Sequence, residues 1–475
     1  MTRIVVISDL HIGAGKLDDC DQELERGLVD FLSSLSTDDS PIELVINGDF
    51  LDFVQADPWE INGLESRTLT GIPLCFTELH SVSKLKSILQ SHKAVFSGLN
   101  LFLARAVGNR LVILPGNHDV DFYWPAVRNG FVAAVGSGSE EIAAKIFFHL
   151  DQVYRPKIAP GVWIEHGHQY DPINSFFVPQ FDATGKKREP KSFWSNALPP
   201  IFDDLAGEKR LYECIGTRFL IKFINRLDSE YPFVDNVKPF SRFLKIFGAS
   251  IGTRGYSLSK PAIAIWSMLR FLGNRLIEAP GDLLNHEQQA LNDAQMLLRS
   301  LLPQMSVRRQ RAMADQLIAR GYNLEVPLDM LIRQPAGAES LLNFLVDHPD
   351  LTTNLSQLEG GILEQEESGG TLSLAKGFRI DETGALTSAA RAVLKAPDVK
   401  VVVMGHTHER IDGSDYLNPG CWTRYYTFAP DNATPSWQVL QEQSYKTFPF
   451  QMNYVEIRPE ETPIAKLKTF RQRQI

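Results

Sequence analysis

The stretch RIVVISDLHI, residues 3–12, holds the pattern from which the rest of the fold can be inferred. Its apolar part, Arg3–Ile7, is a short run of mostly β-branched residues, which is typical of strands buried on both faces. Two polar residues, Asp9 and His11, follow where such a strand would end. The sequence therefore predicts an interior strand whose carboxyl end carries side chains that can bind a metal ion.

The same succession of an apolar run and a polar signature occurs four more times. The further runs are Glu43–Ile46, Leu111–Leu114, Val162–Glu165 and Val399–Met404. The signatures that follow them are GDFLD at 48–52, GNHD at 116–119, HGH at 166–168 and GHTH at 405–408. In an open α/β sheet, the loops beyond the carboxyl ends of the strands converge on one crevice. We therefore expect all five signatures to share one site.

Helical segments alternate with the first of these strands, as in an α/β fold. Residues Asp21–Leu35 carry apolar residues at helical spacing, and a second helix is predicted over roughly Ser83–Val107. The first helix has three possible N-caps: Asp18, Asp19 and Asp21. Turn residues and the strand-like run Met452–Ile457 within Tyr416–Ile457 predict further strands that complete the same sheet system.

A long stretch between these parts interrupts the alternation and has a mainly helical pattern. We therefore predict a discontinuous domain formed by residues 1–171 and 396–475, with a mainly α-helical insertion or cap at 172–395. The candidate helices of the insertion are Leu211–Leu227, Pro239–Phe247, Pro261–Ile277, Asn285–Leu302 and Ser306–Arg320. Lys and Arg outnumber Asp and Glu between residues 186 and 275, where they are interleaved with aromatic residues. Such helices could pack on the domain, lie in a membrane interface, or line a groove for an acyl chain or nucleic acid.

Composition excludes several classes of protein. The chain has 475 residues, of which 44% are hydrophobic and 22% charged, as in soluble globular proteins. A net charge of -9 offers no general attraction for a polyanion, so nucleic acid is a less favoured partner. The four cysteines form no CxxC pair, which argues against a disulfide framework or a thiolate zinc site.

The sequence also indicates where in the cell the protein is expected. No stretch approaches the roughly 18 uninterrupted apolar residues of a spanning helix. The first residues lack the apolar core and cleavage site of a signal peptide. We expect a cytoplasmic protein, with peripheral membrane or lipid contact through the cap left open.

The residue types in the five signatures indicate the chemistry of the expected site. Carboxylate oxygens, an amide oxygen and imidazole nitrogens suit borderline divalent cations, and no thiolate is offered. One carboxylate that bridges two ions would let both hold a phosphate and would make hydroxide available near neutral pH. The signatures therefore predict a binuclear metal centre.

Taken in order, the five signatures resemble those of the calcineurin-like metallophosphoesterase superfamily. Its blocks D-x-H, G-D-x-x-D, G-N-H-D/E, H-G-H and G-H-x-H are all present, over residues 3–171 and 398–457. The superfamily's later N-P-G-S block reads Asn418-Pro419-Gly420-Cys421 here. The resemblance implies an α/β (α+β) fold in which a β-sandwich of mixed sheets is flanked by helices, and it does not extend to the insertion.

The resemblance also implies a role for each residue of the signatures. One metal ion would be bound by Asp9, His11, Asp49 and His408, and the other by Asp49, Asn117, His166 and His406. Two divalent ions are implied, with Mn²⁺ expected and Fe²⁺, Zn²⁺, Co²⁺ or Ni²⁺ as alternatives. A metal-bridging hydroxide would attack phosphorus, His118 would assist the leaving group, and Asp52 would orient His118.

Other residues near the signatures have weaker assignments. His168 and Arg410 are candidate substrate-binding residues, although His168 also fits a supporting role and Arg410 a solvated surface position. Tyr170 and Asp171 are expected to be turn residues. The histidines outside the signatures are expected at the surface or in packing: His80, His92, His149, His286 and His348.

These features predict a metallophosphoesterase that hydrolyses a phosphomonoester, a phosphodiester or a nucleotide. Protein phosphatases of the superfamily carry Arg after the second Asp of G-D-x-x-D, and Phe53 at that position disfavours them. The basic aromatic segments, with a loose likeness to UDP-diacylglucosamine pyrophosphatases, leave a lipid-linked pyrophosphate hydrolase at the membrane surface as an alternative. A nuclease is a further alternative. A non-catalytic protein-binding scaffold is the alternative of another class, and the complete set of expected ligands argues against it.

Overall fold

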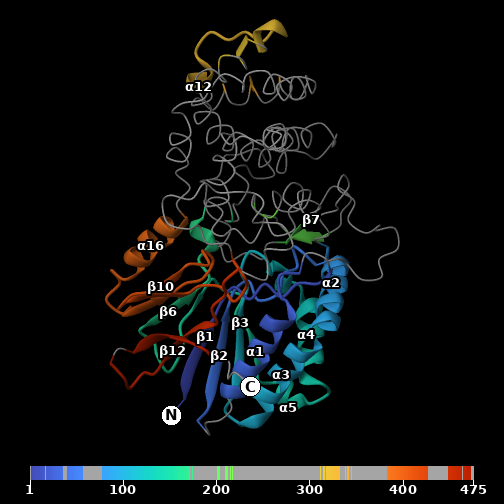
Figure 1. The fold of residues 1–475 in the computed structure, drawn as a ribbon, viewed down its shortest axis with the longest axis vertical. Helices are drawn as coiled ribbons and strands as arrows, with labels where there is room; N and C mark the ends of the chain where they lie inside the picture. The colour runs from blue at the N-terminus through green and yellow to red at the C-terminus, as the bar shows by residue number, and fades with distance from the viewer. Residues whose placement is uncertain are drawn as a thin grey trace.

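The fold is taken from a computed structural model of the chain (Figure 1). It describes residues 2–15, 18–35, 40–56, 77–171, 382–425, 448–462 and 464–471. Short pieces between 174 and 217 and between 311 and 344 are also described. The insertion helices predicted from Pro239, Pro261 and Asn285 lie outside these residues.

Six strands form the first sheet, in the order β13-β12-β1-β2-β3-β4. Their bounds are β1 Arg3–Ile7, β2 Ile42–Asn47, β3 Arg110–Leu114, β4 Ile146–Phe148, β12 Asn453–Ile457 and β13 Ala465–Thr469. Strands β1 to β4 are parallel, whereas β12 and β13 are antiparallel to their neighbours. The C-terminal strands therefore complete the sheet that the N-terminal strands begin, as the sequence predicts.

Five strands form the second sheet, in the order β10-β11-β9-β6-β5. Their bounds are β5 Val153–Tyr154, β6 Val162–Glu165, β9 Val401–Val403, β10 Arg410–Asp412 and β11 Tyr416–Pro419. The three central strands β11, β9 and β6 are parallel, and the two edge strands are antiparallel to them. Both sheets are thus mixed, with parallel strands at their centres.

Alternate residues of each strand point to opposite faces of its sheet. One face of each sheet packs against the other sheet. From the first sheet, Val6, Val45 and Val112 enter the core between the sheets, where they meet Ile164 and Val403 of the second sheet. Residues of the same strands on the other faces contact helices, so the strands are buried on both faces. This explains why the strand sequences are continuous apolar runs rather than alternating ones.

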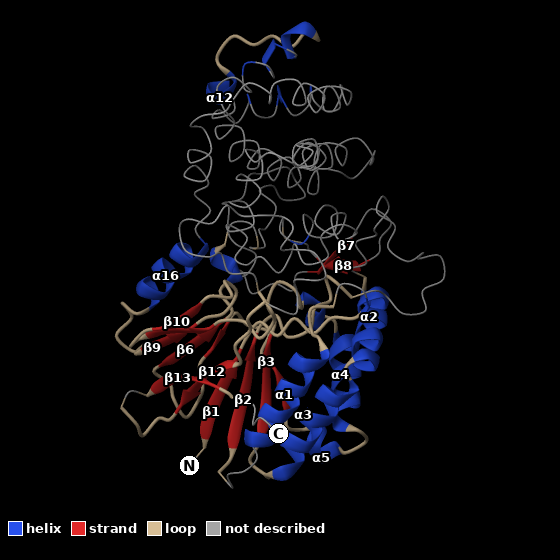
Figure 2. Ribbon diagram, viewed as in Figure 1, coloured by secondary structure: helices blue, strands red, loops and turns tan. Residues whose placement is uncertain are grey.

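Helices cover the two outer faces of this sandwich. Helices α1 Gln22–Leu35, α2 Glu78–Ser91, α3 Lys93–Arg105, α4 Pro125–Gly136 and α5 Glu140–Ala143 lie on the side of the first sheet, and α16 Glu382–Val393 on that of the second (Figure 2). Leu28 and Phe31 of α1 share a core with Ile7 of β1. Leu386 of α16 packs with Val402 of β9. The predicted fold, a sandwich of mixed sheets flanked by helices, is confirmed.

The structure selects one of the possible caps of the first predicted helix and corrects the second predicted helix. Of the three possible caps of α1, Asp21 accepts hydrogen bonds from the backbone N–H groups of Glu23 (2.8 Å) and Leu24 (3.0 Å). The single helix predicted at Ser83–Val107 is two helices, α2 and α3, which meet at His92. Apolar spacing continues through both helices, so the sequence pattern does not reveal the break between them.

His92 is the buried residue at this break, and not a surface side chain. Its Nε2 lies 2.6 Å from the Asp18 carboxylate, and its Nδ1 lies 3.4 Å from that of Glu25. Burial by itself would lower the pKa of His92, but the neighbouring Asp18 and Glu25 outweigh it and raise the pKa above its ordinary value. The imidazolium form of His92 therefore stabilises the contact of the helix break with Asp18 in the loop before α1 and with Glu25 of α1.

Parts of the predicted insertion belong to the packed sandwich. Strands β7 Ile201–Asp203 and β8 Lys209–Leu211 pair with each other, and Leu211 and Cys214 lie in the core on the helical side of the first sheet. The helix predicted at Leu211–Leu227 is thus wrong at its start, where Leu211 is a strand residue. Helix α16, which packs on the second sheet, also falls within the predicted insertion at 172–395. The predicted domain boundaries themselves stay a prediction.

Within the described residues, no helix has both the length and the apolar character needed to cross a membrane.

We predict that His92→Gln destabilises the protein most at low pH. Because the pKa of His92 is raised by folding, its stabilising effect is complete below the unfolded pKa of about 6.5 and is lost as the pH rises through the folded pKa. Urea unfolding at about pH 5.5 should show a loss of about 1–3 kcal/mol in the free energy of unfolding, and a smaller loss at about pH 9.

The matched control is His149→Gln, since the His149 ring bonds to the backbone carbonyl of Val153. Its effect on the free energy of unfolding should not increase at low pH. Equal losses for His92→Gln at the two pH values would contradict the assigned role.

Candidate metal centre

The expected ligands lie in loops with an uncommon backbone conformation. Six described residues other than glycine have positive φ angles: Asp9 (56°), His11 (45°), Asp49 (49°), Ser137 (48°), His406 (69°) and His408 (59°). Positive φ is unfavourable for residues with a Cβ and persists only where the surrounding structure imposes it. Five of these six residues belong to the predicted site, each directly after β1, β2 or β9.

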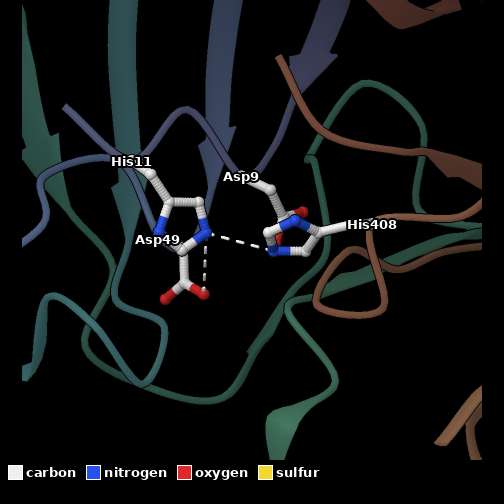
Figure 3. Close-up of side chains that lie close together, drawn as sticks. All are labelled: Asp9, His11, Asp49 and His408. Carbon is white, nitrogen blue, oxygen red and sulfur yellow. Dashed lines mark hydrogen bonds and ion pairs between the residues drawn. The ribbon is translucent and has the colours of Figure 1, made fainter. Parts of the chain in front are cut away.

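Four side chains from three loops form the first group of possible ligands. The atoms that Asp9, His11, Asp49 and His408 can offer to a metal ion all lie within 4.8 Å of one another. Figure 3 shows their side chains close together, with His11 Nε2 3.1 Å from His408 Nε2 and 3.7 Å from Asp49 Oδ2. His408 Nε2 lies 3.3 Å from Asp9 Oδ1.

Asp49 also belongs to a second group, which it forms with His166 and His406. His166 Nε2 lies 3.2 Å from Asp49 Oδ2. His166 Nδ1 lies 2.8 Å from the carbonyl oxygen of Asn47, to which it can only donate. With a metal ion bound, this hydrogen bond would leave the lone pair on Nε2, the nitrogen that faces Asp49.

Asn117 lies in the loop that follows β3, next to His118, whose backbone N–H donates to Asp49 Oδ1 at 2.9 Å. The Asn117 side chain is buried, and its Oδ1 accepts no hydrogen bond from the described residues. Buried polar atoms of native proteins are normally hydrogen-bonded, so the Asn117 oxygen fits the role of a ligand to a bound cation.

The charges at the centre fit bound cations. Asp9 and Asp49 are buried, and in the described part of the chain they pair with histidines rather than with Lys or Arg. Burial by itself would raise the pKa of Asp49, but His166 and His118 hold that pKa well below its ordinary value. Oxygen and imidazole donors with no thiolate suit a divalent cation, and the sharing of Asp49 suggests two neighbouring ions.

His118 and Asp52 form a further cluster beside the first group. Asp52 Oδ2 lies 3.0 Å from His118 Nδ1 and 3.1 Å from His11 Nδ1. Burial by itself would raise the pKa of Asp52, but His118 and His11 hold that pKa far below its ordinary value. One carboxylate therefore holds both imidazoles. The contact of Asp52 with His118 is predicted from the sequence, whereas its contact with His11 is not.

Three buried side chains that the sequence analysis did not assign hold the loops in place. Asp119 accepts hydrogen bonds from the N–H groups of Gly116 (2.5 Å) and Phe50 (2.9 Å), which links two of the loops. Ser8 Oγ donates to the backbone carbonyl of Asn47 at 2.8 Å and lies 2.5 Å from Asp9 Oδ2. Asn418 donates to the carbonyl of Gly405 at 2.8 Å. Asp119 belongs to GNHD at 116–119, and Asn418 begins the Asn-Pro-Gly-Cys block. The spacing of residues within these blocks does not show which groups the two side chains contact.

The two candidate substrate residues lie in different surroundings. His168 is buried, with its ring centroid 5.4 Å from that of His166 and 6.3 Å from that of His406. Burial, with further contributions from His166 and His406, lowers the pKa of His168 well below its ordinary value. Arg410 is exposed on β10 and forms an ion pair of 2.9 Å with Asp412. Contact of either residue with substrate stays a prediction.

Asp171 makes a side-chain contact that the sequence does not predict. It follows the short 3-10 helix η3 His168–Tyr170, and its backbone N–H donates to the carbonyl of His168 as in the expected turn. Its side chain is buried, and Oδ2 lies 2.9 Å from Nε2 of His406.

Comparison with known proteins gives one match. The family model for calcineurin-like phosphoesterases matches residues 2–215, which contain four of the five signatures but not GHTH at 405–408. No curated protein and no solved structure matches the chain.

We predict that Gly116→Ala disrupts the centre. A Cβ at Gly116 would overlap Asp49 Oδ1 and would lie 2.7 Å from the backbone nitrogen of Asp49. The loop would have to move, so the substitution should lower the free energy of unfolding by about 1–3 kcal/mol and reduce bound metal. Urea unfolding and elemental analysis would measure these effects.

Gly13→Ala is the control, because a Cβ there meets its nearest neighbour at 3.5 Å, an ordinary contact. It should retain bound metal. Wild-type metal content in Gly116→Ala would show that the close approach of these loops is not required.

Proposed function

Residues 2–215 of this chain belong to the calcineurin-like phosphoesterase family, and on this premise we propose a hydrolase that cleaves phosphate esters between two divalent cations. The observation that carries the proposal is the position of Asp49. Its carboxylate belongs both to the group with Asp9, His11 and His408 and to the group with His166 and His406. A carboxylate shared by two ligand groups is what a binuclear centre requires.

The ligands that we propose for each ion follow these two groups. Asp9, His11, Asp49 and His408 would bind one ion, and Asp49, Asn117, His166 and His406 the other. Mn²⁺ is the proposed ion, with Fe²⁺, Zn²⁺, Co²⁺ and Ni²⁺ as alternatives, because the donor set admits all of them. When bound, two such cations polarise a phosphate and lower the pKa of water, so that hydroxide is available near neutral pH.

We assign His118 the task of assisting the leaving group. With Nδ1 directed to Asp52, Nε2 is the nitrogen that can donate a proton to the departing oxygen. The pKa of Asp52 stays far below its ordinary range, so this carboxylate remains ionised and stabilises the protonated form of His118. Asp52 also contacts His11, which fixes the distance between the proton donor and one expected metal ligand.

The proposed substrates are small phosphomonoesters, phosphodiesters or nucleotides. Phe53 is fully buried after Asp52, at the position where the protein phosphatases of this superfamily carry Arg. A lipid-linked pyrophosphate and a nucleic acid remain alternatives that depend on the basic aromatic segments. Those segments lie outside the described residues, so no described contact favours either alternative.

Substitutions of Asp49 and His118 should separate metal binding from proton donation. Asp49→Asn should lose both metal and activity, because the shared carboxylate is removed. His118→Ala should retain metal and lose about 10²–10⁴-fold in kcat, because only the proton donor is removed. Elemental analysis and turnover of an aryl phosphomonoester and an aryl phosphodiester would measure these effects.

The control is Asp412→Asn, which removes an exposed carboxylate on β10. It should keep both metal and turnover. Wild-type turnover in Asp49→Asn and His118→Ala would refute the mechanism. Well under one metal ion per wild-type chain after purification with Mn²⁺ would instead favour the non-catalytic scaffold.

A further inference from the structure

His406 has a buried carboxylate partner that lies far from it in the sequence. Asp171 Oδ2 lies 2.9 Å from His406 Nε2, and the Asp171 side chain is fully buried. A carboxylate can only accept a hydrogen bond here, so the proton of the neutral imidazole is held on Nε2. The lone pair is then on Nδ1, which becomes the nitrogen available to a metal ion.

The backbone of His406 is fixed as well as its ring. Its N–H lies 3.1 Å from both carboxylate oxygens of Asp9. Its φ angle is 69°, so the residue is held in a conformation that a free chain seldom adopts. With the backbone held by Asp9 and the ring by Asp171, the direction of Nδ1 is determined from two sides.

Asp171 is in turn fixed by neighbours that extend toward the predicted insertion. Asn174 Nδ2 donates to Asp171 Oδ2 at 2.7 Å. The thiol of Cys214 lies 3.6 Å from Asn174 Oδ1 and 3.1 Å from the hydroxyl of Thr217. Cys214 and Thr217 are both buried. A continuous set of polar contacts therefore joins His406 to the segment around residue 214.

From this geometry we infer that Asp171 is the positioning residue of His406. It holds the ring so that Nδ1 is directed to the second metal ion, and Asn174 keeps Asp171 in place. The inference rests on the proposed binuclear function, because it assigns His406 to one of two ions. Partners of this kind change metal affinity by about 10–100-fold when they are removed.

Metal binding by the full-length protein tests the inference without an activity assay. Apo protein is titrated with Mn²⁺ by calorimetry, and the loaded samples are examined by electron paramagnetic resonance for the coupled signal of a manganese pair. Asp171→Ala should weaken the second Mn²⁺ by about 10–100-fold, leave the first unchanged, and reduce the coupled signal when two ions are added per chain.

Two milder variants make the test independent of any folding defect in Asp171→Ala. Asp171→Asn keeps the shape of the side chain and one accepting oxygen. Its affinity for the second Mn²⁺ should therefore lie between those of wild type and Asp171→Ala. Asn174→Ala keeps Asp171 but removes one of its hydrogen bonds, and it should weaken the second Mn²⁺ by about fivefold. Selective loss at one of two sites is not expected from a general loss of stability.

Glu43→Gln is the matched control, since Glu43 is a fully buried carboxylate of β2 that bonds to Tyr154 (2.6 Å) and Arg110. It should bind both Mn²⁺ ions as the wild type does. If wild type and the Asp171 and Asn174 variants bind two ions equally well, the inference is wrong and the proposed function stands. If wild type binds fewer than two ions, the binuclear function itself fails.

Discussion

The rest of the structure depends on the contacts of the Asp49 carboxylate. Its Oδ2 lies 3.7 Å from His11 and 3.2 Å from His166, and its Oδ1 accepts a hydrogen bond from the backbone N–H of His118 at 2.9 Å. These partners follow β1, β6 and β3, so one side chain contacts loops from both sheets. Both sheets must therefore present the carboxyl ends of their parallel strands at the same end of the sandwich.

This convergence is maintained against unfavourable local terms. The positive φ angles of Asp9 and His406 cost roughly 1–3 kcal/mol each. Burial of the neighbouring carboxylates of Asp9 and Asp49 is also unfavourable. The compensation comes from the packed core, in which the apolar residues of strands such as β1 are buried by the facing sheet on one side and by helices on the other. A rigid sandwich can hold the loops in conformations that they would not adopt alone.

Three of the four expected imidazole ligands are also held by a partner that fixes the ring. Asp52 contacts the Nδ1 of His11, the carbonyl of Asn47 accepts from His166, and Asp171 contacts the Nε2 of His406. In each case the ring nitrogen that remains can bind a metal ion. Asp171 adds a contact toward the segment around residue 214, so the second group of ligands is connected to the start of the predicted insertion.

The sequence by itself determined the five strands, the polar signatures after them and the likeness to the calcineurin-like phosphoesterases, because an apolar run and the residues directly behind it are local features. It also limited the cap of α1 to a few residues. Only the tertiary structure decided that Asp171 contacts His406, that Asp52 also contacts His11, and that the helix is interrupted at His92. These contacts join residues that are distant along the chain, so no local spacing encodes them. They exist only after the two sheets have packed and brought the loops together.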